Sequence, residues 1–247
     1  MKKVFYNKKA IIFDLDGTLS DTIYAIAKAV NLTMDHFGYP THDVDTVRMA
    51  VGNGATTLIK RLMPAELSDN NELVLTVRKK YDEMYALTYM ETTDTYDGIK
   101  EAVHALKNKG MKIAVFSNKQ DEYVKNLVKL YFPDDTVTIS RGQTDLPIKP
   151  DIAGLIKILD QIEVSAFECV FVGDSGVDVE TAKNAKMDFI GVAWGFWGRK
   201  TDAKRRPRRV RRRKGIRRWN PTGVVGEQYT LSRHQSQRPI CRNRRFL

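Results

Sequence analysis

The chain has 247 residues, of which 42% are hydrophobic, enough for one large domain or for a core with a smaller insert. It has no run of about 18 apolar residues, so we expect no transmembrane helix, and the apolar stretch after the basic start is too short for a signal peptide. The two cysteines, Cys169 and Cys241, lie far apart, and Cys169 sits in an apolar run. We therefore expect Cys169 to be a buried free thiol, which indicates a cytoplasmic protein without a disulfide framework.

The net charge of +11 conceals two unlike parts of the chain. Residues 199–247 contain 18 Lys or Arg and two acids, whereas residues 1–198 contain 23 basic and 28 acidic residues. The later part has no apolar periodicity, so we do not expect it to join a sheet. We interpret it as the product of a shifted reading frame. The alternative is a genuine polybasic tail, and only in that case do we expect nucleic-acid binding.

The first predicted element is a buried strand over residues 8–13. Residues 22–90 then follow helical periodicity, with breaks at Gly38–Tyr39–Pro40 and Gly52–Asn53–Gly54. No strand pattern interrupts this span. It therefore predicts an all-helical insert.

Strands and helices alternate after Asp97. We expect helices over 99–109, 121–130, 151–161 and 177–185, and strands over 112–116, 137–140, 169–172 and 189–193. This order predicts an α/β fold, a Rossmann-like parallel sheet with helices on both faces. In such sheets the ligand site lies beyond the carboxyl ends of the strands.

Two carboxylates, Asp14 and Asp16, directly follow the first strand and precede Gly17 and Thr18. Residues at i and i+2 of an extended backbone point the same way, so both carboxylates can reach one pocket. Because close carboxylates repel, a divalent cation such as Mg²⁺ would stabilise the pair. The alternative is a loop with two solvated aspartates.

Three further segments place polar residues at strand ends. Ser117 and Asn118 could donate to a phosphoryl oxygen or serve as a helix cap. Lys149 could neutralise a phosphoryl oxygen or remain solvated. Asp174 ends another apolar strand, and Asp178, four residues on, is either a second site carboxylate or an ordinary acid at a helix N-terminus.

The four segments resemble, in order and position, the four motifs of the haloacid dehalogenase (HAD) superfamily of phosphotransferases. The resemblance implies that Asp14 attacks phosphorus and forms an aspartyl phosphate, and that Asp16 acts as general acid and then base. It implies that Lys149 neutralises Asp14 and the transferred group. It implies that Thr18, Ser117 and Asn118 contact the phosphate. It also implies a Mg²⁺ site formed by Asp14, the backbone carbonyl of Asp16 and Asp174, with Asp178 as a further ligand or as an acid next to the ligands.

The resemblance also implies a domain plan, with a core at 1–20 and 92–198 and a C1-type helical cap at 21–91. Within the superfamily the chain is similar to phosphoglycolate phosphatases, through Val51–Ala55, Tyr96–Gly98 and Gly173–Ala185. A small phosphorylated metabolite is therefore the expected substrate. Gly52, Asn53 and Gly54 are expected to meet it, although a plain turn between helices fits them equally. A phosphomutase of the β-phosphoglucomutase type is the alternative activity, and a monomer or a homodimer fits the sequence.

Overall fold

A computed structural model describes residues 7–197 and 217–218, and its centre is a parallel β-sheet. The strands follow the spatial order β5-β4-β1-β6-β7-β8, and each neighbouring pair is parallel. They span β1 (Ala10–Phe13), β4 (Lys112–Gln120), β5 (Ile139–Gln143), β6 (Cys169–Gly173), β7 (Asp188–Gly191) and β8 (Arg217–Arg218). The predicted α/β fold with a Rossmann-like sheet is therefore confirmed.

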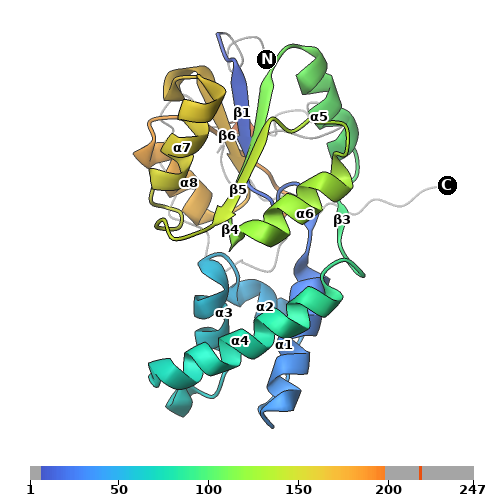
Figure 1. The fold of residues 1–247 in the computed structure, drawn as a ribbon, viewed down its shortest axis with the longest axis vertical. Helices are drawn as coiled ribbons and strands as arrows, with labels where there is room; N and C mark the ends of the chain where they lie inside the picture. The colour runs from blue at the N-terminus through green and yellow to red at the C-terminus, as the bar shows by residue number, and fades with distance from the viewer. Residues whose placement is uncertain (1–6, 198–216, 219–247) are drawn as a thin grey trace, which may run out of the picture.

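Helices cover both faces of this sheet (Figure 1). Strand β1 is apolar at every position, as expected for a strand buried on both sides. Ile11 and Phe13 face one core, while Ala10 and Ile12 face the other. The covering helices are α5 (Ile99–Asn108) and α6 (Asp121–Tyr131) on the first face, and α7 (Ala153–Ile162) and α8 (Gly176–Asn184) on the second, with a short 3₁₀ turn at Ala166–Glu168.

A helical body lies beyond the carboxyl ends of the strands, below the sheet in Figure 1. It consists of α1 (Ile23–His36), α2 (Val44–Ala50), α3 (Gly54–Leu62), a 3₁₀ turn at Ala65–Leu67 and α4 (Asn71–Thr88). The chain enters and leaves it through β2 (Ser20–Asp21) and β3 (Asp94–Thr95), which pair antiparallel. No helix in the described part of the chain is long and apolar enough to cross a bilayer.

The strands β1, β5, β6 and β7 differ from their predicted ranges by one to three residues at an end, and two differences are larger. β4 continues through Gln120, four residues past the predicted end, because its later polar residues still pair with β5. β8 pairs with β7 at Arg217 and Arg218, although we expected no strand after residue 198. Pairing uses backbone groups and does not require apolar side chains, which explains this difference. The rest of 199–247 lies outside the described residues.

The crossing of β5 and α6 gives a stability prediction. A Cβ on Gly142 would lie 2.4 Å from the Lys119 carbonyl oxygen and 2.6 Å from the Asp121 Cα, both backbone atoms. Gly142→Ala should therefore lower the free energy of unfolding by roughly 1–3 kcal/mol, as overpacking does. Gly176→Ala is the matched control, because nothing lies within 4 Å of its Cβ position. Urea unfolding of both variants measures the difference, and equal stability would contradict the packing described.

Candidate active site

A cleft of about 710 Å³, its open mouth included, separates the sheet edge from the helical body. Its floor is formed by residues at the carboxyl ends of β1, β4 and β6, and its opposite wall by α1, α3 and α4. Six of the residues singled out from the sequence as site carboxylates or phosphate ligands line it: Asp14, Asp16, Ser117, Asn118, Lys149 and Asp174. Strand ends from distant parts of the chain thus converge as the parallel topology predicts.

Asp14 and Lys149 form a buried ion pair on the floor of the cleft. The Lys149 ammonium lies 2.9 Å from Asp14 Oδ1 and 2.7 Å from Asp178 Oδ1, and its side chain is 2% exposed. The Leu15 backbone N–H also donates to Asp14 Oδ1, at 2.7 Å. Both donors therefore engage Oδ1, and no described donor is hydrogen-bonded to Oδ2.

Asp178 is fully buried and is engaged through both carboxylate oxygens. Oδ1 accepts from Lys149, while Oδ2 accepts from the Ser175 backbone N–H at 3.0 Å and from its hydroxyl at 2.6 Å. The bond from the Ser175 N–H belongs to the capping box that begins α8, in which the Asp178 N–H donates in turn to the Ser175 hydroxyl oxygen at 3.3 Å. Although one of its oxygens lies near Asp14 and Asp174, Asp178 is better placed to orient Lys149 than to ligate a cation.

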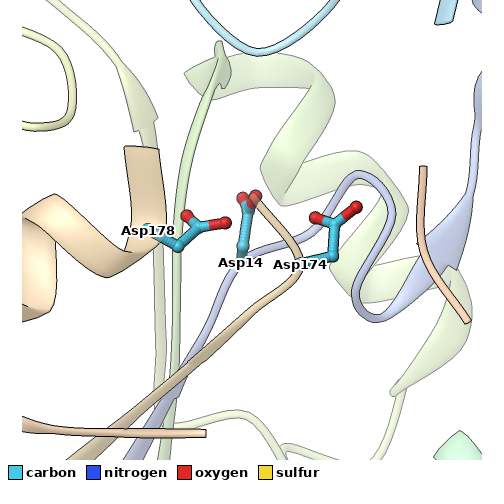
Figure 2. Close-up of side chains that lie close together, drawn as sticks. All are labelled: Asp14, Asp174 and Asp178. Atoms are coloured by element: carbon cyan, nitrogen blue, oxygen red, sulfur yellow. The ribbon is translucent and has the colours of Figure 1, made fainter. Parts of the chain in front are cut away.

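Asp174 lies on the opposite side of Asp14 from Asp178 (Figure 2). The Phe196 N–H donates to its Oδ2 at 2.7 Å, and the Thr18 hydroxyl lies 3.4 Å from Oδ1. A Cβ on Gly195 would come within 2.4 Å of Oδ2, so only glycine lets this loop approach so closely. Thr18 therefore supports Asp174 and is absent from the residues that line the cleft.

Asp14, Asp174 and Asp178 each have an oxygen within 4.8 Å of an oxygen of the other two. Burial, and then the charge of Asp178, raise the pKa of Asp14 to about 7, against the opposing effect of Lys149. Burial, and then the charges of Asp178 and Asp14, raise the pKa of Asp174 well above its usual value. Burial would lower the pKa of Lys149, but Asp14 and Asp178 outweigh it and hold that pKa above its usual range.

These charges fit a divalent cation. Three ionised carboxylates and one ammonium leave two negative charges in a buried site, which is unfavourable without a counter-charge. The donors are carboxylate oxygens, with no His or Cys among them, and such donors suit Mg²⁺. Of the three carboxylates, those of Asp14 and Asp174 belong to residues that line the cleft.

The Asp16 carboxylate accepts hydrogen bonds from two residues that the sequence did not indicate as partners. Lys119 donates to its Oδ1 and Oδ2 at 3.0 and 3.1 Å, and the Thr22 hydroxyl donates to Oδ1 at 2.6 Å. Lys119 follows Ser117 by two residues near the end of β4, where the pairing with β5 is irregular, and both residues line the cleft. The sequence predicts that this strand ends at Phe116, and so it does not indicate Lys119 as a site residue.

The remaining predicted residues connect the two walls of the cleft. The Asn118 amide donates to the carbonyls of Gly52 and Lys149, at 3.1 Å each, and its own oxygen accepts from the Lys149 N–H at 2.7 Å. Gly52 and Gly54 line the cleft, with φ of +122° and +77°. Asn53 does not line it, since its side chain accepts from Arg61.

Comparisons with known proteins agree with this geometry. The family model for haloacid dehalogenase-like hydrolases matches residues 11–192. A phosphoglycolate phosphatase of Colwellia psychrerythraea (strain 34H) is 32% identical over 76% of this chain and 86% of that protein. One from Pseudomonas syringae pv. tomato is 31% identical over 76% and 70% of the two chains. The structure of a predicted phosphoglycolate phosphatase from Haemophilus somnus 129pt has a TM-score of 0.71 and 26% identity, covering 77% of this chain and 87% of that one.

The buried ion pairs of Lys149 give a second prediction. Lys149→Met should lower the free energy of unfolding by about 3 kcal/mol or more, because two buried carboxylates lose their counter-charge. Lys125→Met is the control, since Lys125 makes an exposed i,i+4 pair with Asp121 and should cost less than about 1 kcal/mol. Chemical denaturation in metal-free buffer measures both values. A Lys149 variant as stable as the Lys125 variant would contradict this description of the site.

Proposed function

The chain belongs to the haloacid dehalogenase-like hydrolases and is a phosphoric monoester hydrolase, and we propose that it cleaves a small phosphomonoester through an aspartyl phosphate on Asp14. The observation that carries the proposal is the buried Asp14 carboxylate at the floor of the cleft, paired with Lys149 through one oxygen. Phosphoglycolate is the first substrate to test, because relatives about 30% identical over most of their length are named for it.

In the first step, Asp14 Oδ2 attacks phosphorus and the bond to the leaving oxygen breaks. Oδ1 is already engaged by Lys149 and by the Leu15 N–H, which fixes the orientation of the carboxylate. Carboxylates are established nucleophiles for phosphoryl groups. Lys149 then neutralises charge on the aspartyl phosphate, while Asp178 holds the ammonium in place. The Ser117 hydroxyl and the backbone around Asn118 are proposed to bind the phosphoryl oxygens.

Asp16 is proposed to transfer the protons. It donates one to the leaving oxygen in the first step, and then accepts one from the water that attacks the phosphoenzyme. That attack breaks the bond between phosphorus and Asp14 and releases inorganic phosphate. The hydrogen bonds from Lys119 and Thr22 direct the Asp16 carboxylate toward the cleft. Release of phosphate, rather than its return to the leaving group, separates this hydrolase from the alternative phosphomutase.

We propose Mg²⁺ as the cofactor, held by Asp14, Asp174 and the backbone carbonyl of Asp16. When bound, Mg²⁺ supplies positive charge to the phosphoryl oxygens and to the carboxylates. This differs from the sequence prediction in one respect. Asp178 accepts from Lys149 and, unlike Asp14 and Asp174, does not line the cleft, so we assign Asp178 to positioning Lys149.

The domain plan supports a lid. We propose that residues 21–91 are a cap that closes over a core formed by 1–20 and 92–198, with hinges at β2 and β3. Closure would exclude water, as enzyme lids do. The bond from Asn118 to the Gly52 carbonyl ties the cap loop to the catalytic edge of the sheet. A cytoplasmic location is part of the same proposal.

The nucleophile is tested by substitution. Asp14→Asn should lower kcat at least about 1,000-fold with Mg²⁺ present, because an amide cannot form the covalent intermediate. Rapid-quench mass spectrometry should detect a phosphorylated wild-type protein and no such species in the variant. Asp69→Asn is the control, since Asp69 is 95% exposed and lies outside the cleft. An Asp14→Asn variant that keeps about a tenth of the activity would refute the mechanism.

The metal site is tested by thermal unfolding. The pKa of Asp14 rises on folding from 3.8 to about 7, so the metal-free fold loses stability as pH rises through that window, where the unfolded chain ionises first. Mg²⁺ should therefore raise the Tm more at about pH 8 than at about pH 5, where bound protons compete with the cation. Asp174→Asn should lose most of this shift, and Asp69→Asn should keep it. A shift independent of pH would contradict the assignment.

A further inference from the structure

Lys119 occupies a position in the cleft that the proposed chemistry does not require for the phosphoryl group. Its ammonium lies 3.0 Å from Asp16, and its side chain is only 7% exposed. It also lies 4.6 Å from the centre of the Tyr85 ring, so it spans the gap between β4 of the core and α4 of the helical body. An ammonium over an aromatic face is a favourable arrangement, and it fixes where the charge lies.

Tyr85 is itself held rigidly. It stacks between Tyr81 and Tyr89, one helical turn to either side on α4, with ring centres 5.7 and 5.6 Å away. Tyr123, on α6, packs edge-on against it at 5.0 Å. Tyr85 is 1% exposed, and its hydroxyl has no hydrogen-bond partner among the described residues. The ring that packs against the Lys119 ammonium is therefore held in place by its neighbours before any substrate enters.

Among the described residues that line the cleft, two have cationic side chains, Lys119 and Lys149. Lys149 is committed to Asp14 and Asp178, on the side of the nucleophile. Lys119 adjoins Asp16, which is proposed to protonate the leaving oxygen. Lys119 is therefore the cation placed beside the leaving group. An ammonium has three N–H donors and the Asp16 oxygens accept two of them, which leaves one donor for the leaving group.

The wall opposite the catalytic edge is mostly apolar. It includes Ile26, Val51 and Leu58 together with the tyrosine rings, and its acid, Asp82, is paired with Arg78. A charged group enters such a wall only when an opposite charge pairs with it, and there a charge-assisted hydrogen bond is stronger than in water. A leaving group with an anionic oxygen would therefore gain from Lys119, whereas an uncharged leaving group of the same size would not.

We propose that Lys119 is a specificity-determining residue, and that it selects phosphomonoesters whose leaving group carries a carboxylate close to the ester oxygen. This rests on the proposed function, since it assumes that Asp16 marks the leaving-group side of the cleft. It adds to that function a residue that binds the substrate's second anionic group. The Tyr85 ring packs against the Lys119 ammonium and holds its charge where it can contact the substrate carboxylate.

The test compares two substrates that differ in the carboxylate. Phosphoglycolate and ethyl phosphate have leaving groups of similar size, and the wild-type enzyme with Mg²⁺ should favour phosphoglycolate in kcat/KM. In Lys119→Met the ratio of the two kcat/KM values should fall about tenfold to a hundredfold, the range expected for one hydrogen bond to a charged group. Lys119→Arg, which keeps the charge, should retain part of the preference.

Two features keep the result interpretable. A ratio measured in one preparation does not depend on the fraction of folded enzyme, so partial misfolding of Lys119→Met cannot imitate the effect. Because Lys119 also contacts Asp16, both substrates should lose activity in Lys119→Met, and only the ratio reports the carboxylate contact. Lys125→Met, an exposed lysine outside the cleft, should leave the ratio unchanged.

The outcomes separate the two proposals. If Lys119→Met slows both substrates equally, Lys119 only positions Asp16 and this inference fails while the phosphatase mechanism stands. If the wild-type enzyme favours ethyl phosphate or phenyl phosphate, the apolar wall selects uncharged leaving groups and the inference is likewise overturned. If the wild-type enzyme with Mg²⁺ hydrolyses none of the three esters, the proposed function fails and the inference fails with it.

Discussion

The burial of Lys149 between Asp14 and Asp178 is the constraint on which the rest of the site depends. An ammonium that is 2% exposed is stable only with its charge paired, and here two carboxylates provide the pairing: Asp14 at the end of β1 and Asp178 in the first turn of α8. The arrangement requires β1, β6 and the loop before α7 to meet at one edge of the sheet. It also orients the proposed nucleophile, because it engages one oxygen of Asp14.

The parallel sheet provides that meeting point through its topology. β1 lies between β4 and β6, so Asp14, Ser117 and Asp174 emerge side by side although they are distant in sequence. Close approach of the backbone then completes the site. Gly173 abuts Asp178 and Gly195 abuts Asp174 so closely that a Cβ at either position would clash with the carboxylate. Burial of these acids raises the pKa of Asp14 and Asp174, which is the electrostatic basis for expecting a cation.

The helical body contributes a second, different surface. Where the sheet edge presents charge, the helices present apolar side chains and a stack of tyrosines. Lys119 and Asp16 lie where the two surfaces meet, and each contacts a residue of the helical segment or its entry: Tyr85 for Lys119, and Thr22 for Asp16. The proposed selectivity residue, Lys119, thus belongs to the sheet side of the cleft, while the ring that packs against its ammonium belongs to the helical body.

The sequence by itself determined the α/β alternation, the helical insert, the strand ends that carry Asp14, Ser117 and Asp174, and the segment before a helix that carries Lys149. Periodicity and local motifs encode these features, because they depend on neighbours within a few residues. Only the tertiary structure decided which oxygens are engaged. The capping box at Ser175 occupies Asp178, β4 extends far enough to bring Lys119 to Asp16, and Asn53 turns away to Arg61. The pairing of Arg217 and Arg218 with β7 was also beyond the sequence. Each of these depends on contacts between residues remote in the chain, which no local pattern specifies.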